Sequence, residues 1–224
     1  LYLLHGAGGD EDAWTTLGRA QHILDNLIAT GKAKPMVVVM TNGNPNCQAA
    51  PGEWSAGQYI PSFYGYQGAK PAATMDESFP DVMNYVENHY KVAKDKAHRA
   101  ICGLSMGGGH SFDISRRFPT KFDYIGLFSA GLHVSTTGDF RNDFYKQLQG
   151  NEEAKTQLAT LFKNKPKLYW IGMGKTDFLY KSSADLRRYF DEKGYKYTYL
   201  ETEGGHIWRN WRVYLTEFAQ KIFK

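Results

Sequence analysis

The sequence predicts an α/β fold in which a mostly parallel sheet has helices on both faces. Two observations lead to this prediction. Strand-like apolar runs alternate with helix-like segments along the whole chain, and the run 35–40 is apolar throughout, as in a strand covered on both faces. At 224 residues, with no internal repeat, low-complexity tract or linker, the chain fits one large domain. We therefore expect a single domain over residues 1–224.

The predicted elements follow one another in a regular order. Residues 1–4 form a short apolar strand, and apolar residues at helical spacing over 17–30 predict the first helix. The run 35–40 is the second strand. The remaining elements are helix 79–90, strand 100–104, helix 106–118, strand 122–128, strand 168–173, helix 179–193, strand 195–200 and a closing helix 208–223. Gly194 suits the left-handed position after a helix.

The segment 41–75 breaks this alternation. It is rich in Gly, Pro and aromatic residues and shows no helical or strand period. Loops of this length are uncommon in compact domains and are usually functional or disordered. One interpretation is a loop that packs its aromatic rings on its own body. The other is a wall of a substrate pocket, with Trp54, Tyr59 and Tyr64, together with Trp208 at the start of the last helix, as candidate binding residues.

Composition argues against some classes of partner. The net charge of +4 is small and the Lys and Arg residues are spread along the chain, so a nucleic-acid partner is not predicted. No apolar stretch approaches the roughly 20 residues of a membrane span. Cys47 and Cys102 show no metal-ligand spacing, and a disulfide between them stays open. The chain opens in a strand-like run without Met, so we expect N-terminal sequence, and a leader with it, to be missing.

The strongest motif is Gly103-Leu104-Ser105-Met106-Gly107, which matches Gly-x-Ser-x-Gly between a predicted strand and a predicted helix. A sharp strand-to-helix turn of this kind lifts a serine hydroxyl above the sheet edge and leaves room for nothing larger than glycine on either side. The alternative is a glycine-rich turn without chemistry. The context on both sides favours Ser105 as a nucleophile.

A serine nucleophile needs a histidine base and an orienting carboxylate, in the chain order Ser, acid, His. Only His133 and His206 lie well downstream of Ser105, and His206 stands where the base is expected, between the last strand and the last helix. For the acid, Asp177 follows strand 168–173 directly, and Asp139 is the serious rival. We predict the triad Ser105, His206 and Asp177.

Two backbone N–H groups should stabilise the oxyanion. One belongs to Met106, the residue after the nucleophile. The other comes from the loop His5-Gly6-Ala7-Gly8-Gly9, where Ala7 is the preferred donor because Gly6 allows a tight turn. His5 is expected to hold this loop by hydrogen bonds rather than to act as a second base.

With these residues in place, the sequence resembles the putative esterase family that includes esterase D, and within it carbohydrate esterase family one, the feruloyl and acetyl xylan esterases. The matching pieces cover the whole chain: 3–6 with Trp14, 103–108, 177–180, and 204–206 followed by Trp208 and Trp211. The resemblance implies an α/β-hydrolase fold and the same triad and oxyanion donors. Family members usually begin with two or three further strands, so we expect N-terminal strands to be missing here. Mycolyl transferases of this family carry Asp-Gly in place of His-Gly.

The resemblance implies a serine carboxylesterase that needs no metal or cofactor. The partner it implies is an ester-decorated plant polysaccharide or oligosaccharide. A hydroxycinnamoyl ester is the first choice of substrate because the aromatic segment could flank a phenolic acyl group, and an acetyl ester on xylan is the alternative. A hypothesis of another class is a catalytically silent, carbohydrate-binding relative. Polymeric substrates of this family also predict a secreted or periplasmic protein.

Overall fold

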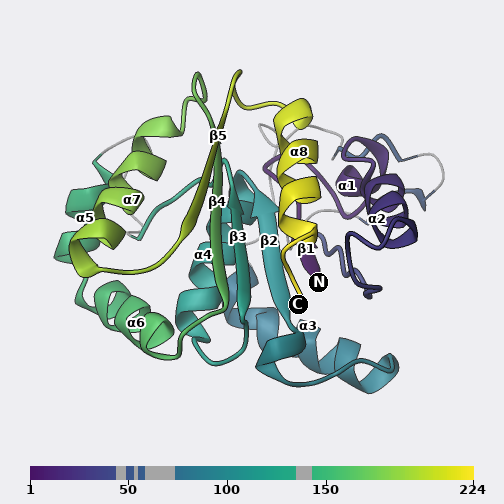
Figure 1. The fold of residues 1–224 in the computed structure, drawn as a ribbon, viewed down its shortest axis with the longest axis horizontal. Coiled ribbons are helices and arrows are strands. Elements are labelled where there is room, and N and C mark those ends of the chain that lie inside the picture. Colours follow the sequence, from purple (N-terminus) through teal and green to yellow (C-terminus); the bar gives the residue numbers. More distant parts are fainter. Residues whose placement is uncertain (44–48, 53–54, 59–73, 135–142) are drawn as a thin grey trace.

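The structure is a computed structural model that describes residues 1–43, 49–52, 55–58, 74–134 and 143–224 (Figure 1). Within these residues, all neighbouring strands pair in parallel and their spatial order follows the chain order. The five strands are β1 (Tyr2–Leu4), β2 (Ala100–Leu104), β3 (Tyr124–Phe128), β4 (Leu168–Gly174) and β5 (Thr198–Thr202). The predicted α/β fold with a parallel sheet is confirmed.

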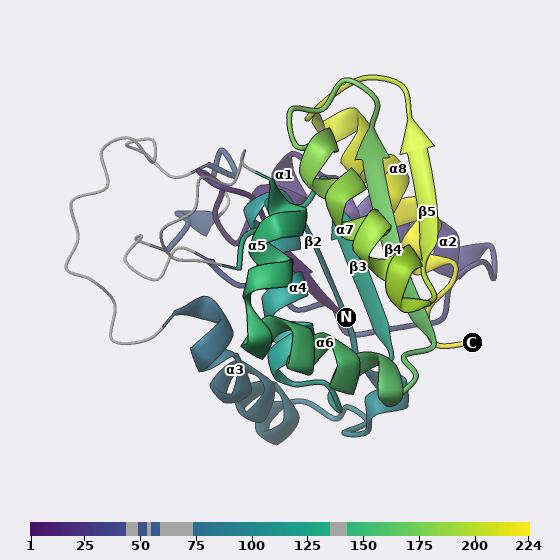
Figure 2. The same ribbon diagram turned by 90° about the vertical axis from the view of Figure 1, so that its left-hand side faces the viewer.

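Helices cover both faces of the sheet (Figures 1 and 2). One face carries α1 (Ala13–Thr16), α2 (Ala20–Ala29) and α8 (Trp208–Ala219). The opposite face carries α3 (Met75–His89), α4 (Met106–Arg117), α5 (Phe144–Gly150), α6 (Glu152–Lys163) and α7 (Tyr180–Lys193). Across the described ranges, no helix is both long and apolar enough to cross a bilayer.

Side chains that alternate along each strand supply the two halves of the core. In β1 and the residue before it, Leu1 and Leu3 pack with Trp14 on the α8 side. Tyr2 and Leu4 point to the other face, where they join the cluster under α3 and α4. Successive side chains of a strand point to opposite faces, so a strand buried on both sides must be apolar at every position. This is why these strands read as continuous apolar runs.

The predicted strand 35–40 is the main difference between prediction and structure. Only Val39 forms a bridge, with Tyr2 of β1, through the hydrogen bonds Leu3 N–H to Val39 O (2.9 Å) and Val39 N–H to Leu1 O (2.8 Å). Val37 is 44% exposed. The segment lies beside β1, outside the five-stranded sheet, and its apolar side chains are at most partly buried. The apolar run at 35–40 therefore lies next to the sheet, but the predicted strand is not formed there.

Several element boundaries also differ from the predicted ones. Helix α3 begins at Met75 and not at residue 79, because Thr74 caps it. The Thr74 hydroxyl accepts the Glu77 N–H (3.4 Å) and the Glu77 carboxylate accepts the Thr74 N–H (2.9 Å). Pro80 therefore lies inside the helix rather than in its first turn. Strand β5 begins at Thr198, three residues later than predicted.

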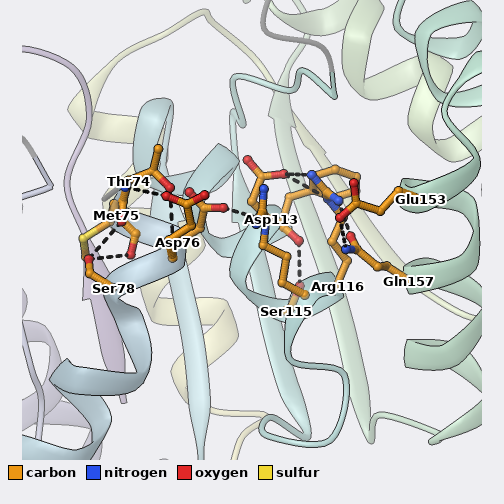
Figure 3. Close-up of polar contacts among 12 residues, drawn as sticks. Thr74, Met75, Asp76, Ser78, Asp113, Ser115, Arg116, Glu153 and Gln157 are labelled. Atoms are coloured by element: carbon orange, nitrogen blue, oxygen red, sulfur yellow. Dashed lines mark hydrogen bonds and ion pairs between the residues drawn. The ribbon is translucent and has the colours of Figure 1, made fainter. Parts of the chain in front are cut away.

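Helices α5 and α6 lie in a stretch for which the sequence analysis assigns no element. Figure 3 shows how α6 is joined to α4: Arg116 pairs with Asp113 at 2.7 Å and donates to the side chain of Gln157. Asp113 and Arg116 are both buried. Because α4 starts immediately after Ser105, this polar contact braces the helix on which the candidate nucleophile depends.

Candidate active site

Four of the predicted site residues follow the carboxyl ends of four different strands. Ala7 follows β1, Ser105 follows β2, Asp177 follows β4 and His206 follows β5. In a parallel sheet these ends share one edge, which is where open α/β sheets bind their ligands. The topology therefore gathers residues that are up to 199 positions apart in the sequence.

Ser105 occupies a strained turn. Its backbone has φ 51° and ψ −114°, a conformation that residues other than glycine rarely adopt. The flanking glycines are required by space: a Cβ atom at Gly103 would lie 2.6 Å from the backbone of Gly107, and a Cβ atom at Gly107 would lie 2.4 Å from the His5 carbonyl oxygen. The predicted strand-to-helix elbow is present, and it leaves Ser105 partly exposed.

His206 is hydrogen-bonded to the predicted acid. Its Nδ1 lies 3.0 and 2.9 Å from the two carboxylate oxygens of Asp177, which is only 4% exposed. The Leu179 N–H also donates to Asp177, at 2.9 Å. A carboxylate accepts only, so Nδ1 carries the proton and Nε2 is left as the acceptor. This is the tautomer that a general base for serine requires.

The loop that carries His206 is tied to the loop that carries Asp177. The Thr176 N–H donates to the Gly204 carbonyl at 3.1 Å, and the Lys175 N–H donates to the Thr202 carbonyl at 2.9 Å. The Asn210 side chain donates to the Gly205 carbonyl at 3.0 Å. These backbone contacts hold the two loops at a fixed separation.

Ser105 and His206 line one cavity of about 280 Å³. The cavity is also lined by Ala7, a predicted oxyanion donor, and by Trp208, a predicted binding residue. The other residues in its lining are Gly6, Gly8, Gly9, Ala13, Leu17, Gly57, Gln58, Leu104 and Trp211. The structure thus brings the candidate nucleophile, base and oxyanion loop to the same space, and Asp177 stands behind the base.

The hydrogen bonds of His5 explain the direction of the Ala7 N–H. The Gly6 carbonyl accepts from His5 Nδ1–H (2.8 Å) and from the Gly9 N–H (3.0 Å), while His5 Nε2 accepts from the Gly43 N–H (2.8 Å). In a trans peptide the C=O and the next N–H point in opposite directions. Anchoring the Gly6 carbonyl therefore turns the Ala7 N–H the other way.

Both ring nitrogens of His5 are used in these bonds, which fits its expected role in holding the loop. Burial lowers the pKa of His5, so the ring stays neutral and Nε2 remains an acceptor. The second predicted donor, Met106, is the first residue of α4. N–H groups of a first helical turn have no acceptor within the helix and are available to an anion.

Several predicted residues lie elsewhere. His133, the weaker candidate for the base, is exposed on the segment after β3. Asp139, Trp54, Tyr59, Tyr64 and Cys47 lie outside the described residues. Cys102 is a free thiol with no exposed surface, and burial raises its pKa. Among described residues, no His, Cys, Asp and Glu side chains group in a way that could hold a metal ion.

Sequence reasoning missed several contributions to the site, among them those of Gln58 and Phe178. Gln58 reaches the cavity because it forms an antiparallel bridge with Gly9 of the oxyanion loop, a pairing without a local signal in the sequence. Phe178 packs against the imidazole of His206 with ring centroids 4.6 Å apart. Its position next to Asp177 was the one clue in the sequence.

Known proteins are similar to this chain over its whole length. The endo-1,4-beta-xylanase/feruloyl esterase of Xylanibacter ruminicola is 32% identical over 228 residues, which include all of this chain. The chain spans 26% of the length of that relative. The acetyl esterase of Caldicellulosiruptor saccharolyticus is 23% identical over 244 residues, covering all of this chain and 83% of the relative.

Solved structures show the same fold. A CE1 ferulic acid esterase from Anaeromyces mucronatus, in complex with ferulic acid, has a TM-score of 0.69 at 20% identity, over 99% of this chain and 78% of the other. An S-formylglutathione hydrolase from Staphylococcus aureus has a TM-score of 0.71 at 17% identity, over 100% and 83%. The family model described as putative esterase matches residues 1–222. This chain has an α/β-hydrolase fold, and it belongs to the putative esterase family.

Proposed function

We propose that this chain is a feruloyl esterase that removes hydroxycinnamoyl groups from plant cell-wall xylan. The observation that supports this most is the cavity beside Ser105 and His206, whose apolar walls include Leu17, Trp208 and Trp211. A flat phenolic acyl group can pack against such aromatic walls, whereas an acetyl group would leave most of a volume of about 280 Å³ unfilled. The 32% identical relative is named for the same activity.

The proposed mechanism uses the residues of the site in two half-reactions. Ser105 Oγ attacks the ester carbonyl while His206 Nε2 takes the hydroxyl proton and Asp177 holds the imidazole. The negative charge on the carbonyl oxygen is stabilised by the amides of Ala7 and Met106. His206 then gives the proton to the leaving alcohol, and the acyl group stays on Ser105. Water attacks this ester while His206 takes its proton, and His206 then returns the proton to Ser105 Oγ as the acid departs.

The test compares two ester classes. Purified protein is assayed on methyl ferulate and on acetylated xylan, with Ser105→Ala as the blank. The proposal expects release of ferulate that depends on Ser105. Release of acetate alone, with no turnover of methyl ferulate, would overturn it.

Acetyl xylan esterase is the second candidate, because the acetyl esterase relative matches all of this chain and 83% of its own length. The same assay decides between the two.

In either case a polymeric substrate too large to enter a cell supports the further proposal that the protein acts outside the cytoplasm. Detection of the native protein in the culture medium or periplasm of its host would test this.

A further inference from the structure

Two exposed apolar side chains flank the candidate base. Phe178 is 62% exposed although its neighbours Asp177 and Leu179 are buried, and Ile207 is 41% exposed. Single exposed apolar residues are common on protein surfaces and need no special reason. Phe178 contacts the ring of His206, and Ile207 follows His206 in the sequence, so both exposed side chains are near the candidate base.

The imidazole of His206 contacts two aromatic rings. Trp211 contacts it edge-on, with centroids 4.9 Å apart and an interplanar angle of 85°. Phe178 lies against it at 4.6 Å and 51°. Trp211 and Ser105 line the same cavity, whereas Phe178 does not line it. The exposed ring of Phe178 therefore belongs to the outer rim of the site, next to the base.

The chemistry fixes which part of an ester lies near this rim. His206 must return its proton to the oxygen of the departing alcohol, so that oxygen has to lie close to the imidazole. A cavity of about 280 Å³ can enclose an acyl group but not a polysaccharide. The sugar that carries the ester must then lie outside the cavity, at the surface beside His206.

We propose that Phe178 is a binding platform for this sugar, and thus a specificity-determining residue on the alcohol side of the ester. The inference rests on the proposed function. One face of a sugar ring consists of C–H groups and is apolar, so it can cover the exposed part of an aromatic ring and remove apolar surface from water. Ile207, the exposed residue that follows His206 in the sequence, is a further apolar side chain near this site.

The experiment pairs two esters that have the same acyl group. Methyl ferulate has no sugar, and a feruloylated arabinoxylan oligosaccharide has one. Wild type, Phe178→Ala, Phe178→Trp and Tyr85→Ala are compared on both. Tyr85 is the matched control because it is an aromatic residue 58% exposed on α3, where it stacks on His89 and not on the site. Melting temperatures check that each variant is folded.

For Phe178→Ala the proposal expects the loss in kcat/KM on the oligosaccharide to be about tenfold larger than the loss on methyl ferulate, with the difference mostly in KM. Phe178→Trp should retain activity on the oligosaccharide, and Tyr85→Ala should match wild type on both. Equal losses on both esters would show that Phe178 only supports His206. Unchanged activity on both would also overturn the proposal.

The two proposals fail in different ways. If wild type releases acetate but no ferulate, the feruloyl function is wrong, and the platform is tested on 4-nitrophenyl acetate against acetylated xylo-oligosaccharide with the same variants. A loss confined to the sugar ester still supports the platform. Equal losses, or none, still overturn it.

Discussion

Gly107 of α4 lies directly against the backbone of His5, so close that a Cβ atom at position 107 would be 2.4 Å from the His5 carbonyl oxygen. This contact joins the helix that begins with Met106 to the loop that contains Ala7. Backbone packing thus contributes to holding the two predicted oxyanion donors together. The second glycine of Gly-x-Ser-x-Gly has a specific role in this contact.

Gly107→Ala should therefore impair catalysis. The added methyl group forces α4 and the loop at His5 apart, and losing one oxyanion donor lowers kcat by about 100-fold or more. The measurement is kcat on 4-nitrophenyl acetate, with the melting temperature recorded in parallel. Gly150→Ala is the control, because a Cβ atom there meets nothing within 4 Å. A folded Gly107→Ala variant with wild-type kcat would contradict this account of the elbow.

Asp177→Asn should leave the protein folded and lower kcat by a factor of about 10³ to 10⁴. The amide can present an N–H to His206 Nδ1, which favours the wrong tautomer and removes the acceptor from Nε2. The assay is kcat and KM on 4-nitrophenyl acetate, with the exposed Asp81→Asn as the control. If Asp177→Asn loses less than about tenfold, another carboxylate supports the base, and Asp139 becomes the candidate to test.

His5→Ala should lower kcat by about tenfold or more and leave KM nearly unchanged, because the oxyanion forms only in the transition state. Without the imidazole, the Gly6 carbonyl loses one donor and the Gly43 N–H loses its acceptor. Steady-state kinetics separate the two parameters, and the exposed His22→Ala serves as the control. A rise in KM at constant kcat would instead place His5 in ground-state binding.

Stability should fall in mild acid because of His110. Burial lowers the pKa of His110 to about 4, whereas in the unfolded chain a histidine titrates near 6.5. Between these values the unfolded state binds the proton and the folded state does not, so unfolding becomes more favourable as the pH decreases. Above about pH 6.5 this contribution to stability is complete.

The measurement for His110 is the melting temperature from pH 7.5 to 4.5 for wild type and His110→Gln. The variant should lose less stability across this range than wild type. Part of the decrease in melting temperature with pH should remain in the variant, because burial also lowers the pKa of His5. The exposed His22→Gln should behave like wild type. Parallel curves for His110→Gln and wild type would show that His110 does not contribute.

The sheet and the candidate triad were predictable because their signals are local. Each central strand is an apolar run. Ser105 and Asp177 closely follow such runs, and His206 stands between the last strand and the last helix. The expected chain order of serine, acid and histidine then favoured His206 over His133 as the base. The parallel sheet places the carboxyl ends of the strands at one edge, and this brings the three residues together.

The parts that could not be predicted depend on contacts between distant segments. An apolar run such as 35–40 looks the same in the sequence whether it becomes a central strand or lies beside the sheet. Only its contacts in the folded chain, a single bridge between Val39 and Tyr2, show which of the two it is. The bridge from Gly9 to Gln58 is equally non-local. Helix α6 was readable in principle, since Ala154, Leu158 and Leu161 have helical spacing and all three are buried.

The central claim is that Ser105 is an activated nucleophile, and its most direct test is covalent labelling. The protein is incubated with a fluorophosphonate probe, digested and analysed by mass spectrometry, with Ser105→Ala and heat-denatured wild type as controls. We expect one adduct, on the peptide that contains Ser105, and none in either control. A folded wild-type protein that does not react, or an adduct that persists in Ser105→Ala, would contradict the assignment.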